Sequence, residues 1–162
     1  MTMKKKGNWK TYAFWIGLTE AVGFLSGWIT REGTEAYENG DIIKPFLSPP
    51  SIVFPIVWTI LFALMGWGIA RVRLNRPTPA REKAARLFIL QLAFNFCWSI
   101  YFFNLQAFGV AFVWLVVLWG LILWMTLTFR KVDTLAAKLQ IPYLLWVAFA
   151  GYLNLGVWLL NR

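Results

Sequence analysis

The chain has 162 residues, of which 59% are hydrophobic and only 14% charged, with a formal net charge of +9. Soluble domains carry about 25% charged residues, so lipid is the expected solvent for most of this surface. The chain has no histidine and a single cysteine, Cys97, which excludes an intrachain disulfide and weighs against metal sites and Ser-His or Cys-His nucleophiles. We therefore expect no metal site and no required cofactor.

The first expected membrane span, residues 12–30, carries glycines and one acid. Gly17, Gly23 and Gly27 share a helix face with Glu20, and the last two glycines fit the GxxxG spacing of closely packed membrane helices. At these glycines we expect another helix to pack closely against this span, either within the bundle or across a dimer interface. Glu20 is the only ionisable group deep in an expected span, and a neutral carboxyl hydrogen-bonded to a neighbouring helix is favoured over a functional one.

Residues 31–50 connect the first two spans and hold four of the seven acidic residues. Twenty residues is long for a connection in so compact a chain. We expect either a lid over the outer mouth of the bundle, involving Tyr37, Lys44 and Pro45, or a solvated acidic loop.

The second expected span, residues 51–70, follows Pro49 and Pro50, which suit a helix start because proline lacks an N–H and already has a helical φ. Its twenty residues carry no charge and would form a helix about 30 Å long, enough to cross a bilayer. One face of this helix is expected to carry Phe54, Trp58, Phe62 and Met65.

Residues 87–129 form an uncharged run of 43, too long for one helix across a bilayer. Asn104, Gln106 and Gly109 provide a turn, so we expect spans at 87–105 and 108–129 joined by a tight hairpin. Amides are costly in hydrocarbon unless they are paired, so the polar stripe of the third span should face the bundle. That stripe contains Gln91, Asn95, Trp98, Ser99 and Phe102.

The fifth expected span, residues 139–160, has a comparable stripe of Pro142, Trp146, Phe149, Ala150 and Leu153. If the stripes of spans two, three and five converge, they enclose an aromatic chamber with a few amide and indole donors. Such a chamber suits a flat, largely apolar ligand with a polar edge. The alternative is that the stripes only pack the helices against one another.

Lysine and arginine are distributed unevenly between the two ends of these spans. Thirteen fall on one side and three on the other, namely Arg31, Lys44 and Arg162. The positive-inside rule then places the N-terminus in the cytoplasm and the C-terminus outside. We expect an all-α membrane protein, a single domain (1–162) of five transmembrane helices in a bacterial cell membrane. Its basic charge faces anionic lipid, and nucleic acid is not an expected partner.

Three sequence blocks support a more specific hypothesis: KPFLSPPSIVFPIVW (44–58), QLAFNFCWSIYFF (91–103) and IPYLLWVAFAGYLN (141–154). In this order they resemble the TspO family of tryptophan-rich sensory and translocator proteins, formerly called peripheral benzodiazepine receptors. The resemblance implies a five-helix bundle, commonly homodimeric, that acts as a sensor or transporter-like receptor. Its ligands would be tetrapyrroles such as protoporphyrin IX and synthetic benzodiazepine-type compounds. The pocket residues matched by position are Pro49, Trp58, Asn95, Trp98, Ser99, Trp146 and Ala150, and the helical stripes add Phe62, Phe102 and Leu153.

The chain departs from the family pattern in two places. Many members have a loop tryptophan, to which light-dependent porphyrin breakdown has been attributed together with the residue matching Trp146. Here Glu38 occupies that position and Tyr37 is the nearest aromatic, which weakens the alternative of a porphyrin-degrading enzyme. Tyr152 has no basic residue before Arg162, so the sterol-recognition pattern is absent and cholesterol binding is not supported. A ligand-independent membrane scaffold is the remaining alternative.

Overall fold

The computed structural model describes residues 8–162, and within that range every regular element is a helix. The all-α prediction is therefore confirmed for the described chain. Lys4, Lys5 and Lys6, which contribute to the charge asymmetry, lie outside the described residues. The elements in chain order are α1 (Asn8–Ile29), α2 (Arg31–Asn39), α3 (Val53–Leu74), α4 (Pro79–Ser99), the π-helix η1 (Ile100–Asn104), α5 (Phe108–Arg130), α6 (Thr134–Lys138) and α7 (Ile141–Leu160).

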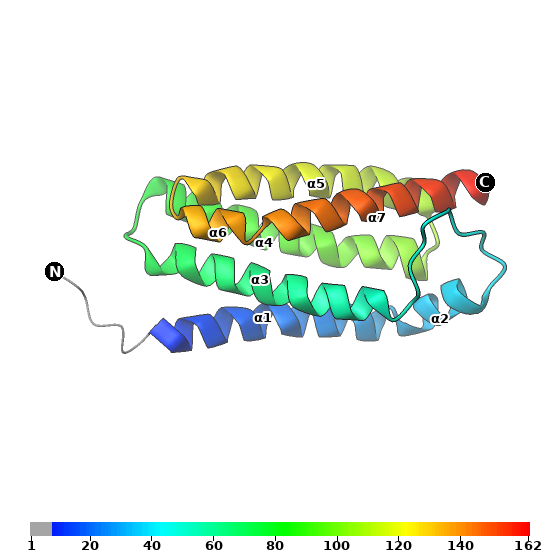
Figure 1. Cartoon of the computed structure of the whole chain (residues 1–162), viewed down its shortest axis with the longest axis horizontal. Coiled ribbons are helices and arrows are strands. Elements are labelled where there is room, and N and C mark those ends of the chain that lie inside the picture. Colours follow the sequence, from blue (N-terminus) through cyan, green and yellow to red (C-terminus); the bar gives the residue numbers. More distant parts are fainter. Residues whose placement is uncertain (1–7) are drawn as a thin grey trace.

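The long helices run side by side in a bundle (Figure 1). Helix α1 packs mainly on α3, α4 on α5, and α5 on α7. Helix α2 lies at one end of the bundle, where it packs against η1, and the connection from α2 to α3 reaches the end of α7 before returning (Figure 1). Helix α6 and the connection between α3 and α4 lie at the opposite end.

Four helical segments in residues 8–162 are long and apolar enough to cross a membrane: Val53–Leu74, Pro79–Asn104, Phe108–Arg130 and Thr134–Leu160. They correspond to the second to fifth expected spans, so a multi-pass membrane protein is supported. Helix α1 has 22 residues but is not among these four. The first expected span, residues 12–30 in α1, and the orientation of the termini therefore remain predictions.

Local sequence explains two helix boundaries. Helix α4 begins eight residues before the expected span because the Thr78 hydroxyl accepts the Arg81 N–H (3.1 Å) and Pro79 occupies the first turn, so a charged segment extends the apolar helix. The expected hairpin between the third and fourth spans is confirmed. It turns at residues 105–107, where Gln106 has a φ of 47°.

The prediction of a loop at residues 31–50 is wrong for its first half, which forms helix α2. The physical reason is amphipathic docking: Tyr37 is buried against η1, whereas Glu32 and Glu35 are exposed. Gly33 allows this close approach, because a Cβ there would lie 2.6 Å from the carbonyl oxygen of Phe103. Residues 31–39 are therefore a docked helix and not a solvated acidic loop.

The glycines of α1 have different environments. A Cβ at Gly23 would lie 2.5 Å from the Phe62 ring, so Gly23 does pack within the bundle. Gly17 and Gly27 meet nothing within 4 Å in this chain, so their alternative role in a dimer stays a prediction. Helix α1 also packs closely on α3 at Gly66, where a Cβ would lie 2.5 Å from the Cα of Ile16.

Candidate ligand-binding chamber

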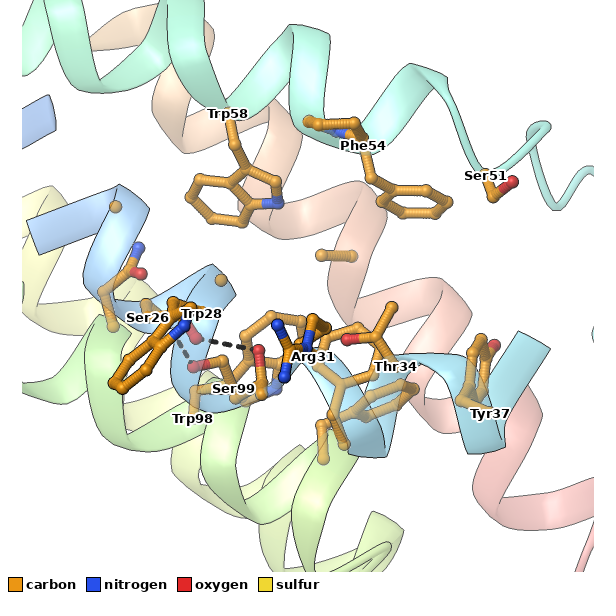
Figure 2. Close-up of a pocket in the computed structure, with 18 of the residues that line it drawn as sticks. Ser26, Trp28, Arg31, Thr34, Tyr37, Ser51, Phe54, Trp58, Trp98 and Ser99 are labelled. Carbon is orange, nitrogen blue, oxygen red and sulfur yellow. Dashed lines mark hydrogen bonds between the residues drawn. The ribbon is translucent and has the colours of Figure 1, made fainter. Parts of the chain in front are cut away.

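A cavity of about 730 Å³ lies inside the half of the bundle that α2 covers. Helices α1, α3, α4 and α7 and the π-helix η1 form its walls, and residues of α2 line its outer end (Figure 2). Its volume lies within the range of about 300–1,000 Å³ that is usual for small-molecule sites. We call this cavity the chamber.

Nine of the ten residues predicted to bind ligand line this chamber. They are Trp58, Phe62, Asn95, Trp98, Ser99, Phe102, Trp146, Ala150 and Leu153. The tenth, Pro49, is not in the lining, because this part of the chain reaches the chamber only at Ser51, two residues before α3 begins. Phe54 and Pro55, from the same helical stripe as Trp58, also line it. The structure thus brings the three predicted stripes together around one space, and ligand binding there remains a prediction.

Aromatic side chains form opposite sides of the chamber. Trp58 and Phe54 of α3 lie on one side and Trp98 on the other, with open space between them (Figure 2). Each wall is reinforced by neighbouring rings: the Trp58 and Phe62 centroids lie 5.7 Å apart, and those of Trp98 and Phe102 lie 5.4 Å apart. Two facing aromatic walls can hold a flat conjugated molecule by stacking.

The π-helix η1 contributes two consecutive phenylalanines to the chamber. Phe102 and Phe103 both line it, although successive residues of an α-helix point about 100° apart. Widened turns of this kind occur frequently at functional sites. The sequence predicted Phe102 from helical spacing but contained no signal for the π-helix, so Phe103 was missed.

A hydrogen-bonded chain holds the amides beneath the chamber. The Asn95 amide donates to the Tyr143 hydroxyl (2.7 Å), which donates to the Gln91 amide oxygen (2.8 Å). Asn95 is 5% exposed, and the other two members of this chain, Tyr143 and Gln91, are fully buried. The expectation that the polar stripe of the third span faces the bundle and is paired is therefore confirmed. Because its partner Tyr143 is itself held by Gln91, Asn95 presents a rigid polar group to the chamber.

A second cluster of hydrogen bonds beside the chamber links helices α4, α7 and α5. Trp98 donates its indole N–H to the Asn154 amide oxygen (3.1 Å), and the Asn154 amide donates to the Phe108 carbonyl (2.8 Å). The Ser26 and Ser99 hydroxyls lie 2.7 Å apart and join α1 to α4. Sequence reasoning missed Ser26 and Asn154. Asn154 is an amide inside an apolar span, the same signal that identified Asn95.

The indole of Trp146 is the exception to this pairing. Its Nε1 is buried and has no hydrogen-bond partner, one of two such side-chain atoms among residues 8–162. Trp114 and Trp119, in contrast, donate to the carbonyls of Phe94 (2.9 Å) and Leu144 (3.0 Å). A buried donor without a partner costs about 1–3 kcal/mol. One residue of the chamber wall therefore retains an unused donor.

Charged side chains gather at the outer end of the chamber. Arg31, the first residue of α2, lines it together with Trp28 and Thr34 (Figure 2). Among the ion pairs of the described residues none involves Arg31. Three acids, Glu20, Glu35 and Glu38, also line the chamber. Sequence reasoning counted Arg31 only as a topogenic charge and did not place it in the site.

The side chains predicted for a lid have two different roles. Tyr37 lines the chamber, and burial, with a smaller effect of Glu38, raises the pKa of its phenol to about 12. Lys44 lies outside the lining and fastens α2 by pairing with Glu38 (2.8 Å), its Nζ lying 4.9 Å from the centre of the Tyr37 ring. The phenol therefore remains neutral in a covered, partly apolar site.

Residues 40–52 are fastened to α7. Ile43 and Asn161 exchange two hydrogen bonds of 2.9 Å, and the Tyr152 hydroxyl donates to the Phe46 carbonyl (2.6 Å). Pro45 is buried against Gly156, where a Cβ would meet the proline ring at 2.5 Å. Pro45 is therefore an anchor of the covering segment and does not line the chamber.

Comparison with known proteins shows similarity over nearly the whole chain. The model of the TspO/MBR family matches residues 15–159. The tryptophan-rich protein TspO of Chlorobaculum tepidum is 40% identical over 153 residues, covering 93% of this chain and 96% of that protein. The translocator protein homolog of Schizosaccharomyces pombe is 38% identical, covering 77% of each chain. The translocator protein of Bos taurus is 33% identical, covering 86% of this chain and 83% of that protein.

Proposed function

The chain belongs to the TspO/MBR family of membrane proteins, and from that premise we propose that it binds a tetrapyrrole of the protoporphyrin IX type in the chamber. Bound there, the tetrapyrrole would make the protein a sensor or transporter-like receptor. The observation that carries the proposal is the pair of facing aromatic walls, Trp58 and Phe54 against Trp98, around a cavity of about 730 Å³.

The chamber offers a matching group for each chemical feature of this ligand class. The conjugated macrocycle stacks between the aromatic walls, which exclude water from both of its faces. A propionate carboxylate at the outer end pairs with the guanidinium of Arg31, which can donate two parallel hydrogen bonds. The unused indole N–H of Trp146 is available to an acceptor atom of the ligand after a small rotation of its ring. Benzodiazepine-type ligands would use the walls but not the Arg31 contact.

Binding is proposed in preference to degradation. The position of the family's loop tryptophan is Glu38, whose carboxylate is held by Lys44, and the neighbouring Tyr37 packs against Phe102 and Phe103. No second indole at that position faces Trp146. A porphyrin bound here therefore lacks the residue pair to which light-dependent breakdown has been attributed.

We further propose that α1 also crosses the membrane, as the first of five spans, and that the N-terminus is cytoplasmic. Helix α1 is 22 residues long, about 33 Å, and runs beside α3 (Figure 1). Its Thr19 hydroxyl donates to the Phe62 carbonyl of α3 (2.7 Å), which satisfies this polar group inside the bundle. The basic ends of α3, α4 and α5 meet at one end of the bundle, as the positive-inside rule requires. A bacterial cell membrane and a homodimer remain expectations from the sequence.

Titration of the detergent-purified protein with protoporphyrin IX, followed by the porphyrin's absorbance, tests the proposal. Trp58→Ala should weaken binding about tenfold, because loss of one stacking face removes about 1–1.5 kcal/mol. Trp67→Ala is the matched control: Trp67 lies in the same helix, is 43% exposed and does not line the chamber. Equal affinities of the two variants would refute the chamber as the site.

A second ligand tests the role of Arg31. Arg31→Gln should weaken binding of protoporphyrin IX and leave binding of its uncharged dimethyl ester unchanged, because only the diacid has carboxylates. An equal loss for both ligands would show that Arg31 acts through the structure of α2 and not through the carboxylate. Thermal melting of each variant without ligand reports whether the fold is preserved.

A further inference from the structure

A second cavity, of about 740 Å³, lies at the end of the bundle opposite α2. It is a groove on the outside of the bundle, between the first turns of α4 and the last turns of α5. Three cationic side chains line it: Lys83 from α4, Arg130 at the end of α5, and Lys131 just beyond. The groove shares no lining residue with the chamber.

The groove has an excess of positive charge. Among the residues that the structure describes, no acidic side chain lines the groove, and all three of its cations are exposed. The nearby acids are occupied elsewhere: Glu82 pairs with Arg73 (3.2 Å) and Arg81 (3.0 Å), and Asp133 pairs with Arg71 (2.9 Å). None of the groove cations takes part in an ion pair among residues 8–162. The groove can therefore accept a negatively charged group without displacing an acidic side chain.

The remainder of the groove is apolar and faces outward. Trp124 is 50% exposed and Leu127 is 51% exposed, and the Lys83 ammonium lies 4.8 Å from the centre of a Trp124 ring. The apolar surface continues along α5 through Val116 and Val113, which are 53% and 61% exposed. A cationic end followed by a long apolar strip matches a molecule with an anionic head and a hydrocarbon tail.

We propose that this groove is a binding site for an anionic phospholipid. Lys83, Arg130 and Lys131 hold the phosphate of the headgroup, and an acyl chain lies along Trp124, Leu127 and the outer face of α5. Basic pockets beside membrane helices recognise anionic headgroups, with a contribution of about 1 kcal/mol for each cation near the surface. The site is independent of the function proposed for the chamber. It assigns a specific site to charges that the sequence explained only as topogenic and as generally facing anionic lipid.

The test measures lipid binding to the delipidated, detergent-solubilised full chain by native mass spectrometry. Phosphatidylglycerol provides an anionic headgroup, phosphatidylcholine a zwitterionic one with the same acyl chains, and glycerol 3-phosphate the anionic headgroup without a tail. We expect phosphatidylglycerol to bind at least tenfold more tightly than phosphatidylcholine, and glycerol 3-phosphate not to compete. Equal affinity for the two lipids would overturn the proposal, and effective competition by glycerol 3-phosphate would show a plain phosphate site.

A pair of triple variants separates the groove from general electrostatic attraction. Lys83→Gln/Arg130→Gln/Lys131→Gln should lose the preference for phosphatidylglycerol, with an affinity at least tenfold lower. The control Arg76→Gln/Arg86→Gln/Lys138→Gln removes the same charge from exposed positions outside the groove and should retain the preference. An equal loss in both triples would refute a localised site. If the first triple does not fold, the single variant Lys83→Gln should still reduce the affinity about fivefold, and an unchanged affinity would refute the assignment.

Discussion

Replacing Gly66 by alanine should loosen the contact between α1 and α3. The added Cβ would lie 2.5 Å from the Cα of Ile16, 2.8 Å from its backbone nitrogen and 2.7 Å from the Thr19 hydroxyl. Favourable carbon contacts are about 3.5–4.0 Å, so α1 must move away by about 1 Å. Two of these contacts are to backbone atoms, which a side-chain rotation cannot relieve.

Two effects of Gly66→Ala lower the free energy of unfolding, and one effect raises it. Overpacking at helix contacts costs about 1–3 kcal/mol. The hydrogen bond from Thr19 to the Phe62 carbonyl, now 2.7 Å, would stretch beyond good geometry and lose about 1 kcal/mol. Alanine recovers up to about 1 kcal/mol of helix propensity relative to glycine. The net loss is about 1–3 kcal/mol, which corresponds to a Tm lower by about 2–12 °C.

Thermal unfolding in detergent, followed by circular dichroism, measures this loss. Gly120→Ala is the matched control, because Gly120 is exposed in the middle of α5 and a Cβ there meets nothing within 4 Å. That variant should have an unchanged or higher Tm. If Gly66→Ala melts at or above the wild-type temperature, the close packing of α1 on α3 is wrong, and with it the placement of Ser26 beside Ser99.

Three further predictions concern other contacts. Burial would raise the pKa of the Asp133 carboxyl, but the bonds from Arg71 and the Ala136 N–H hold that pKa below its ordinary value. The stability that the ionised Asp133 carboxylate gives the folded state is therefore complete above about pH 4, and it disappears as the pH falls through the lowered pKa. Asp133→Asn should lower the Tm at pH 7, with a gap to wild type that closes in acidic melts, and a constant gap would contradict it. Because the pKa of Tyr37 is raised to about 12, the stability due to its neutral phenol is complete below about pH 10 and is lost as pH rises through 12. Tyr37→Phe should therefore melt higher than wild type at pH 11–12 only, and equal melting there would refute the burial argument. Asn154→Leu should cost about 2–3 kcal/mol and weaken protoporphyrin IX binding, because it leaves the Trp98 N–H unpaired and removes the bond to the Phe108 carbonyl. Unfolding and titration would show this, and an unchanged Tm would contradict it.

The long helices and the chamber residues could be read from the sequence because they depend on local periodicity. An uncharged run of twenty or more residues must become a helix in a bilayer, since only a helix satisfies its own backbone there. A stripe of amides and indoles every three or four residues must then face other protein and not lipid. For this reason Asn95, Trp98, Trp146 and Ala150 were all placed correctly in the lining.

Helix α2 could not be predicted in this way. Its nine residues contain three acidic side chains and no apolar run, and they resemble a solvated loop. Only the tertiary contact makes them a docked helix, because Gly33 allows the backbone of η1 to approach and Tyr37 packs on Phe102. Pro49 was misplaced for a similar reason: the path of residues 40–52 depends on Pro45 packing against Gly156, far along the chain.

The sequence by itself therefore determined the class of protein, its family, the second to fifth membrane-spanning segments and the inward faces of three of them. The tertiary structure decided which glycines bring α1 and α3 together, where Arg31 lies, which buried indole keeps a free N–H, and where unpaired cations gather between α4 and α5. The physical reason is the distance along the sequence over which each feature is determined. Periodicity along a helix is a property of neighbouring residues, whereas a distance between helices depends on side chains that are remote in sequence and meet only when the bundle is packed.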